Sequence, residues 1–165
     1  MSEHIISLEW LRNSPDFNYD SYSRNHIVHF GTAGTVCGSA APEFLGDPHC
    51  LDPEQAFVLS LSSCYMLTFL AIASTKGFVV DKYTDTAFGE LGKNNDGKMA
   101  MTKVELRPVV VVGGEKIFSE EDFKSLHDRA HRGCIIANSI AGCVEMIVNP
   151  TMLHAEKNKN NVPLA

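Results

Sequence analysis

The stretch "PEQAFVLSLSSCYMLTFLAIASTKG", residues 53–77, decides the fold, because it is long, almost free of charge and bounded by clear helix signals. Asp52 can cap the first turn, Pro53 suits the first helical position, and Gln55 stands three residues after the cap. The pattern predicts a helix that runs to Lys76 and stops at the following glycine. Its interior is apolar on almost every side, so we expect the central, buried helix of the protein.

The segments around this helix have strand and turn signals. Before it, residues 21–31 and 35–44 read as strands joined by a tight turn. After it, residues 78–92 and 98–114 read as two strands joined over "KNNDG", a strong hairpin signal. The remaining predicted elements are a helix over 119–131 capped by Ser119, a short helical piece over 134–140, and a last strand over 142–150. This order predicts an α+β fold with antiparallel sheets.

The bulk composition excludes several classes of protein. The chain has 165 residues, enough for a single domain over 1–165 with a polar tail over about 155–165. A net charge of −6 without a block of lysine and arginine argues against nucleic-acid binding. The apolar run at 56–73 is broken by serine, cysteine and threonine, which favours a core helix over a membrane span.

The cysteines point to a reducing compartment. There are five of them, no CxxC pair, and no signal peptide in "MSEHIISLEW", so we expect no disulfide framework and a cytoplasmic location. In such a compartment, two cysteines that meet in space are more often redox-active than structural. The sequence indicates no role for Cys37, Cys50 and Cys143.

Cys64, in the middle of the predicted helix, is the candidate functional residue. Ser60 and Thr68 lie one turn away on either side, so the three side chains form a narrow stripe of small groups. A cysteine here can be a buried filler, a metal ligand or a reactive thiol. Because apolar burial raises the pKa of a thiol, reactivity requires a compensating positive charge nearby.

Three motifs, taken in order along residues 20–150, resemble the OsmC/Ohr family of cysteine-based peroxidases. The helix resembles the family's central helix, with Pro53 and Glu54 ahead of Cys64 at the family's ten-residue spacing. "AHRGCIIANSI" resembles the motif of the second cysteine, Cys134, and "YSRNHIVHF" the segment that carries a catalytic arginine, Arg24. "SAAPEFLGDP" is similar to the OsmC-like branch of the family.

The resemblance implies a mechanism and an activity. Cys64 would attack an organic hydroperoxide and become a sulfenic acid, and Cys134 would condense with it to form a disulfide. Arg24 would lower the pKa of Cys64 and bind the developing oxyanion, while Glu54 would orient Arg24. An external dithiol, of lipoyl type by resemblance, would restore the thiols, and no cofactor is needed. The role would be defence against oxidative and osmotic stress.

Two further expectations concern the substrate and the assembly. An apolar wall around the stripe favours an alkyl group on the peroxide. The expected pocket residues are Phe57, Ser60, Leu61, Leu67 and Thr68.

Ten helical residues span about 15 Å, so Glu54 and Cys64 cannot touch along one straight helix. If both serve one site, the helix bends, Arg24 reaches across, or a second subunit contributes. We favour the last, because a helix that is apolar on all sides in so small a chain is most easily covered by a partner chain. We expect a two-fold homodimer with sites at the interface, which the family resemblance makes an intertwined one.

Two alternatives remain open from the sequence. His127 and His131 are four residues apart with Cys134 three further on, a spacing compatible with a metal site. The chain could also be a non-enzymatic stress protein of the same fold that binds a hydrophobic ligand. Neither alternative requires turnover of a peroxide.

Overall fold

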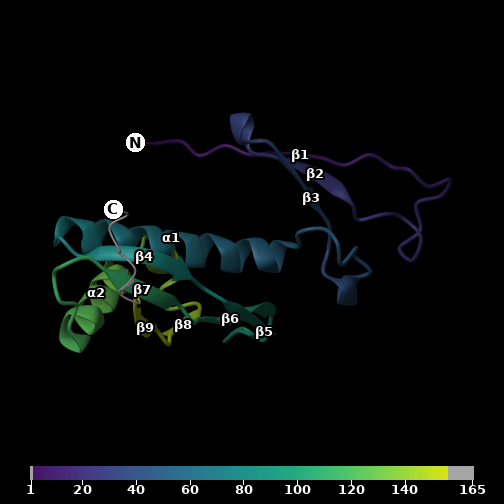
Figure 1. The fold of residues 1–165 in the computed structure, drawn as a ribbon. Helices are drawn as coiled ribbons and strands as arrows, with labels where there is room; N and C mark the ends of the chain where they lie inside the picture. The colour runs from purple at the N-terminus through teal and green to yellow at the C-terminus, as the bar shows by residue number, and fades with distance from the viewer. Residues whose placement is uncertain (1, 156–165) are drawn as a thin grey trace, which may run out of the picture. The chain divides into compact units, whose positions relative to one another are not determined.

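The protein's computed structural model describes residues 2–155 and has the expected mixed α+β fold, with three small sheets and few helices (Figure 1). The chain divides into two compact units, Met1–Phe57 and Val58–Ala165, which are described separately. The prediction of a single domain stays a prediction. Most of the polar tail, residues 156–165, lies outside the described residues.

The first unit is built on one antiparallel sheet. Its strands, in the order β1-β2-β3, are β1 (Ser7–Glu9), β2 (His26–His29) and β3 (Thr35–Gly38). The predicted turn between β2 and β3 is a short 3-10 helix, Gly31–Ala33, and Gly31 there has a φ of 57°. The predicted strands shorten to four residues each, and β1 was not predicted.

Helix α1 (Pro53–Thr75) confirms the central prediction and ends one residue before Lys76. The Gln55 N–H donates to Asp52 Oδ1 at 2.6 Å, and the Asp52 N–H donates back to Gln55 Oε1 at 3.4 Å. Within the single chain only one face of α1 is buried, and it carries Leu61, Tyr65, Phe69 and Ala73. The rest of its apolar surface is at least partly exposed.

Two mixed sheets fill the second unit. The first has the strand order β4-β7-β9 and consists of β4 (Val79–Thr84), β7 (Val109–Gly113) and β9 (Thr151–His154). The second has the order β5-β6-β8 and consists of β5 (Phe88–Lys93), β6 (Met99–Leu106) and β8 (Glu145–Val148). The pairs β6–β8 and β7–β9 are parallel. In this unit the expected antiparallel pairs, β4–β7 and β5–β6, are therefore joined by parallel pairs that were not expected.

The two long strands expected after α1 are in fact four. Residues 78–92 split into β4 and β5, and residues 98–114 split into β6 and β7, on either side of Pro108, which lacks a backbone donor. The hairpin between β5 and β6 forms as predicted, with Gly97 at a φ of 74°. Strand β9 was missed, because only Asn149 and Pro150 separate it from β8 along the chain.

Helices α2 (Glu120–Gly133) and α3 (Ile135–Ile140) complete this unit, with the predicted Ser119 cap on α2. In Figure 1, α2 lies alongside the C-terminal half of α1. Aromatic rings pack between the two helices. The centroid of the Phe69 ring lies 4.4 Å from that of His127 and 6.2 Å from that of Phe123. This packing fixes the end of α2, and hence Cys134, against α1.

Candidate functional site: a thiol pair between α1 and α3

Cys64 lies at the middle of α1, at the edge of its buried face, and is half-buried. Ser60 and Thr68 occupy the neighbouring turns, so the stripe predicted from the sequence exists. The Thr68 hydroxyl donates to the Cys64 carbonyl at 2.8 Å, which ties that hydroxyl to the helix backbone.

Cys134 occupies the junction between α2 and α3, where it ends one helix and caps the next. Its backbone is extended there, with φ −71° and ψ 114°, and the residue is fully buried. The Cys134 thiol is in hydrogen-bonding contact with the Cys64 thiol, and both are free. The structure therefore brings together the two cysteines singled out from the sequence.

Gly133 allows this close approach. A Cβ atom built on it would lie 3.2 Å from Thr68 Cγ2, tighter than an ordinary contact. A larger residue at this position would push the end of α2 away from the turn of α1 that follows Cys64.

The surroundings of the two thiols separate their acidities. Burial raises the pKa of Cys64, but the backbone N–H groups at the start of α3, with the Cys134 thiol and the Thr68 hydroxyl, outweigh it and hold that pKa below its ordinary value. Because the one Thr68 proton already serves the Cys64 carbonyl, we assign the lowering chiefly to the Ile136 N–H and the Cys134 thiol, followed by the Ile135 N–H. Burial, followed by the nearby Cys64, raises the pKa of Cys134 to about 11 despite the Ala137 N–H. Cys64 is therefore the thiol that ionises first, and Cys134 remains a donor to it.

Sequence reasoning missed the amide groups, because it looked for a positive charge. The first N–H groups of a helix have no intrahelical acceptor and favour a nearby anion. The signal was present in "RGCII", where a helix stops at Gly133 and a new one starts directly after Cys134.

An open apolar groove of about 750 Å³ runs past the Cys64 sulfur. Its lining combines α1 and α3 and consists of Leu59, Ser60, Ser63, Cys64, Leu67, Thr68, Ala71, Ile72, Ile135 and Ile136. Three of the expected pocket residues, Ser60, Leu67 and Thr68, line this groove. Leu61 does not: it is fully buried on the face of α1 that packs into the core, and Phe57 is absent from the lining as well.

Arg24 and Glu54 both lie in the first unit, and no ion pair joins them among the described residues. The Arg24 guanidinium donates to the carbonyl oxygens of Tyr22 and Tyr19 and stacks over the Tyr22 ring at 4.0 Å. Glu54 lies in the first turn of α1, and its Oε2 atom is buried without a hydrogen-bond partner among the described residues. The structure thus leaves a buried carboxylate oxygen in need of a donor.

The metal alternative finds no support in the described part of the chain. No group of three or more His, Cys, Asp or Glu residues within 2–155 is arranged to hold a metal ion. His127 Nδ1 lies 2.8 Å from the Tyr65 hydroxyl, and burial lowers the pKa of His127 to about 4. His127 is therefore a neutral core residue, and Cys134 faces Cys64.

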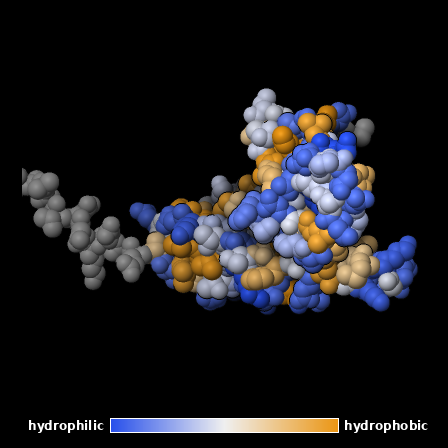
Figure 2. Space-filling view, turned by 90° about the vertical axis from the view of Figure 1, so that its right-hand side faces the viewer, coloured by the Kyte–Doolittle hydropathy of each residue, from blue (hydrophilic) through white to orange (hydrophobic). Residues whose placement is uncertain are grey.

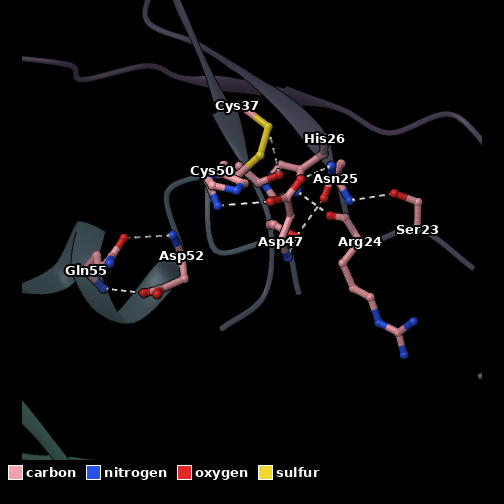
Figure 3. Close-up of a disulfide and its surroundings, with 12 residues drawn as sticks. Ser23, Arg24, Asn25, His26, Cys37, Asp47, Cys50, Asp52 and Gln55 are labelled. Atoms are coloured by element: carbon pink, nitrogen blue, oxygen red, sulfur yellow. Dashed lines mark hydrogen bonds between the residues drawn. A yellow bond between two sulfur atoms is a disulfide. The ribbon is translucent and has the colours of Figure 1, made fainter. Parts of the chain in front are cut away.

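A disulfide joins Cys37 to Cys50 in the first unit, although the cysteine count led us to expect no disulfide framework (Figure 3). Cys37 comes from β3 and Cys50 from the loop before α1. Cys143 is exposed and free. A count of five cysteines could not predict this bond, because the loop before α1 brings two of them together in space.

Residues 46–149 match the family described as OsmC-like protein, and this segment contains α1, both thiols and the groove. The chain belongs to this OsmC-like family. The motif resemblance seen in the sequence is thereby confirmed.

Solved structures agree with this assignment. An OsmC-like protein of unknown function from Vibrio cholerae is 41% identical, with 91% of this chain and 99% of that chain covered and a TM-score of 0.83. An organic hydroperoxide resistance protein from Legionella pneumophila (17% identity, 92% and 98% covered, TM-score 0.65) and one from Bacillus subtilis (15%, 91% and 98%, 0.63) share the fold. A search of the curated proteins found no match.

Helix α1 alone has the length and apolar character of a membrane span within the described residues, with a mean hydropathy of 1.9. The same is true of the core helix of many soluble proteins. In an OsmC-like protein α1 corresponds to the core helix, so no membrane location is indicated.

Proposed function

We propose that this OsmC-like protein is a thiol-dependent peroxidase that reduces organic hydroperoxides to alcohols in stress defence in the cytoplasm. One observation carries the proposal: an acidic thiol, Cys64, lines an apolar groove and contacts a buried second thiol, Cys134. The first would supply the nucleophile and the second the proton donor and later the resolving thiol.

The proposed reaction has three steps: oxidation of Cys64, formation of the disulfide, and its reduction. The Cys64 thiolate attacks one peroxide oxygen, the O–O bond breaks, and the other oxygen leaves with a proton as the alcohol. The Cys134 sulfur then attacks the Cys64 sulfenic acid, which releases water and forms the disulfide. An external dithiol, of lipoyl type by family resemblance, reduces that disulfide and is itself oxidised.

Arg24 and Glu54 complete the proposed site. Arg24 would bind the leaving oxygen as charge develops on it, and the unpartnered Glu54 carboxylate would hold the guanidinium in place. Arg24 must release its present carbonyl contacts to do so. A second copy of the chain is the proposed source of one of these residues at each site.

Exposed apolar surface supports a two-fold homodimer. The side chains of Leu59 and Leu67 on α1 are 57% and 59% exposed. Of the most apolar 18-residue stretch of α1, only 22% is buried within one chain. Figure 2 shows hydrophobic surface, in orange, on this view of the molecule. We expect sedimentation equilibrium to give twice the mass of 18.1 kDa. A stable, active monomer would contradict the assembly.

Two serine variants test the activity itself. Stopped-flow consumption of tert-butyl hydroperoxide with a dithiol present should fall to the uncatalysed rate in Cys64→Ser. Cys134→Ser should complete one turnover and then accumulate Cys64 sulfinic acid, seen as two added oxygens by mass. Cys143→Ser is the matched control and should retain full activity. Normal turnover by Cys64→Ser would refute the mechanism.

The apolar groove also supports a second candidate, a non-enzymatic protein that binds a hydrophobic ligand. In that case an alkyl ligand would bind without a redox change, and the Cys64→Ser variant would bind it as well as the unmodified protein. The peroxide assay separates the two functions.

A further inference from the structure

The second cysteine pair has no part in the proposed peroxide chemistry. Cys37 is exposed on β3, and Cys50 is half-buried in the loop before α1. Their Cα atoms are 4.9 Å apart and the two residues are 13 positions apart in the sequence. Disulfides exchange by attack of a thiolate on one sulfur, and the exposure of the residue Cys37 places this bond near the solvent.

The backbone brings these two cysteines together independently of the disulfide. The Leu51 N–H donates to the Cys37 carbonyl at 2.9 Å, and the Ser39 N–H donates to the Leu51 carbonyl at 3.0 Å. These two bonds form a small bridge between β3 and the loop. After reduction the thiols would therefore stay near each other, which favours re-formation of the same disulfide over bonds to other thiols.

A hydrogen-bond network leads from Cys50 towards the segment that carries Arg24 (Figure 3). The Cys50 N–H donates to the Asp47 carbonyl at 3.1 Å, and Asp47 Oδ2 accepts from Asn25 Nδ2 at 3.0 Å. The fully buried Ser39 hydroxyl donates to Asn25 Oδ1 at 2.9 Å. Asn25 directly follows Arg24, so the loop and the start of β2 are held as one piece.

The same loop leads into the start of α1. Cys50 stands two residues before Asp52, which is 8% exposed and caps the helix through the Gln55 N–H. Glu54 lies in that capped turn. The disulfide therefore sits between the backbone segments of both charged residues of the proposed site.

We propose that Cys37 and Cys50 form a second, reversible redox couple, which exchanges with soluble thiols and disulfides and holds the Arg24 and Glu54 segments when oxidised. In the oxidation, two cysteine thiols and one soluble disulfide give the Cys37–Cys50 disulfide and two soluble thiols. In the reduction, a thiolate attacks the Cys37 sulfur, Cys50 leaves as the thiolate, and a second thiol releases the mixed disulfide. The consequence for turnover rests on the proposed function, but the couple itself does not.

A redox titration of the full-length protein tests the couple directly. Cleavage before aspartate places Cys37 on peptide 20–46, Cys50 on peptide 47–51 and Cys64 on peptide 52–80, so mass spectrometry resolves each after alkylation. Across buffers of reduced and oxidised glutathione, the linked peptides 20–46 and 47–51 should decrease smoothly as reduced glutathione rises, and return on reversal. A linkage that stays complete at every ratio, or never forms, would overturn the proposal.

Hydrogen exchange tests the structural consequence. In the double variant Cys37→Ser/Cys50→Ser, amides of Ser39, Leu51 and Gln55 should exchange at least severalfold faster than in the Cys143→Ser control. Unchanged exchange at these amides would overturn the claim that the disulfide holds this region.

A kinetic measurement tests the effect of the disulfide on turnover, and this test depends on the proposed function. In the same double variant, kcat/KM for tert-butyl hydroperoxide should fall severalfold, while the alkylation rate of Cys64 stays constant. A constant kcat/KM in an active protein would overturn the link to turnover. Absence of all peroxidase activity in the unmodified protein would refute the proposed function alone, because the titration and the exchange measurement need no peroxide.

Discussion

The two halves of the proposed site differ in how completely one chain assembles them. In the second unit, the Cys64 sulfur has its donors in place, from the amides of Ile135 and Ile136. In the first unit, the Arg24 guanidinium is occupied by carbonyl groups of its own segment, and Glu54 Oε2 has no partner among the described residues. The difference predicts that, in the proposed mechanism, the acidity of the thiol and the binding of the leaving oxygen depend on separate groups.

The largest effect that separates the two halves should come from Arg24→Gln. Loss of an oxyanion donor costs roughly 10²- to 10³-fold in turnover, so kcat/KM for tert-butyl hydroperoxide should fall by about that factor. The alkylation rate of Cys64 at pH 7 should change far less, because the amides remain. An equal fall in both rates would show that Arg24, and not the start of α3, makes Cys64 acidic.

Glu54→Gln sharpens the same comparison. If Glu54 acts only by holding Arg24, the double variant Arg24→Gln/Glu54→Gln should have the same kcat/KM as Arg24→Gln alone. Full additivity of the two losses would break the assigned pairing.

A smaller effect is expected from Ile135→Pro, which removes one N–H that faces Cys64. Proline is tolerated at the first position of a helix, and the extended backbone of Cys134 suits the residue before a proline. The side chain of Ile135 is 73% exposed, so little packing is lost. The pKa of Cys64 should rise, and its alkylation at pH 7 should slow roughly tenfold, as for loss of a hydrogen bond to a charged group.

Ile135→Ala is the matched control, because it truncates the same side chain and keeps the N–H. Its alkylation profile should follow that of the unmodified protein. If Ile135→Ala slows alkylation as much as Ile135→Pro does, the amide is not the source of the acidity.

The smallest effect concerns selectivity in the groove. Leu67→Ala removes an apolar wall beside Cys64, so kcat/KM for cumene hydroperoxide should fall about 3- to 10-fold while that for hydrogen peroxide stays constant. Leu153→Ala, a similarly exposed leucine on β9, should change neither rate. Equal losses for both peroxides in Leu67→Ala would show that the groove does not select alkyl groups.

The sequence predicted the central helix well because its signals are local. The Asp52 cap, the proline at the first position and the terminal glycine act within a few residues of the chain. The hairpin between β5 and β6 was predictable for the same reason. The parallel pairs β6–β8 and β7–β9 were not, because pairing between distant strands leaves no local pattern.

The features of the site also divide into those with local signals in the sequence and those that depend on tertiary structure. Helical spacing gave the stripe of Ser60, Cys64 and Thr68, but spacing alone could not tell that Leu61 faces the core. The amides of α3 and the bond from Cys37 to Cys50 depend on how separate segments meet. Local sequence therefore located the thiol, whereas tertiary structure decides what makes it acidic.

The most direct test is the product of one equivalent of organic hydroperoxide, added to the reduced Cys143→Ser protein and followed by alkylation and cleavage before aspartate. The account predicts a linked pair of peptides 52–80 and 128–165, which joins Cys64 to Cys134, with one equivalent of alcohol released. Unlinked peptides, with Cys64 fully alkylated or further oxidised, would contradict it.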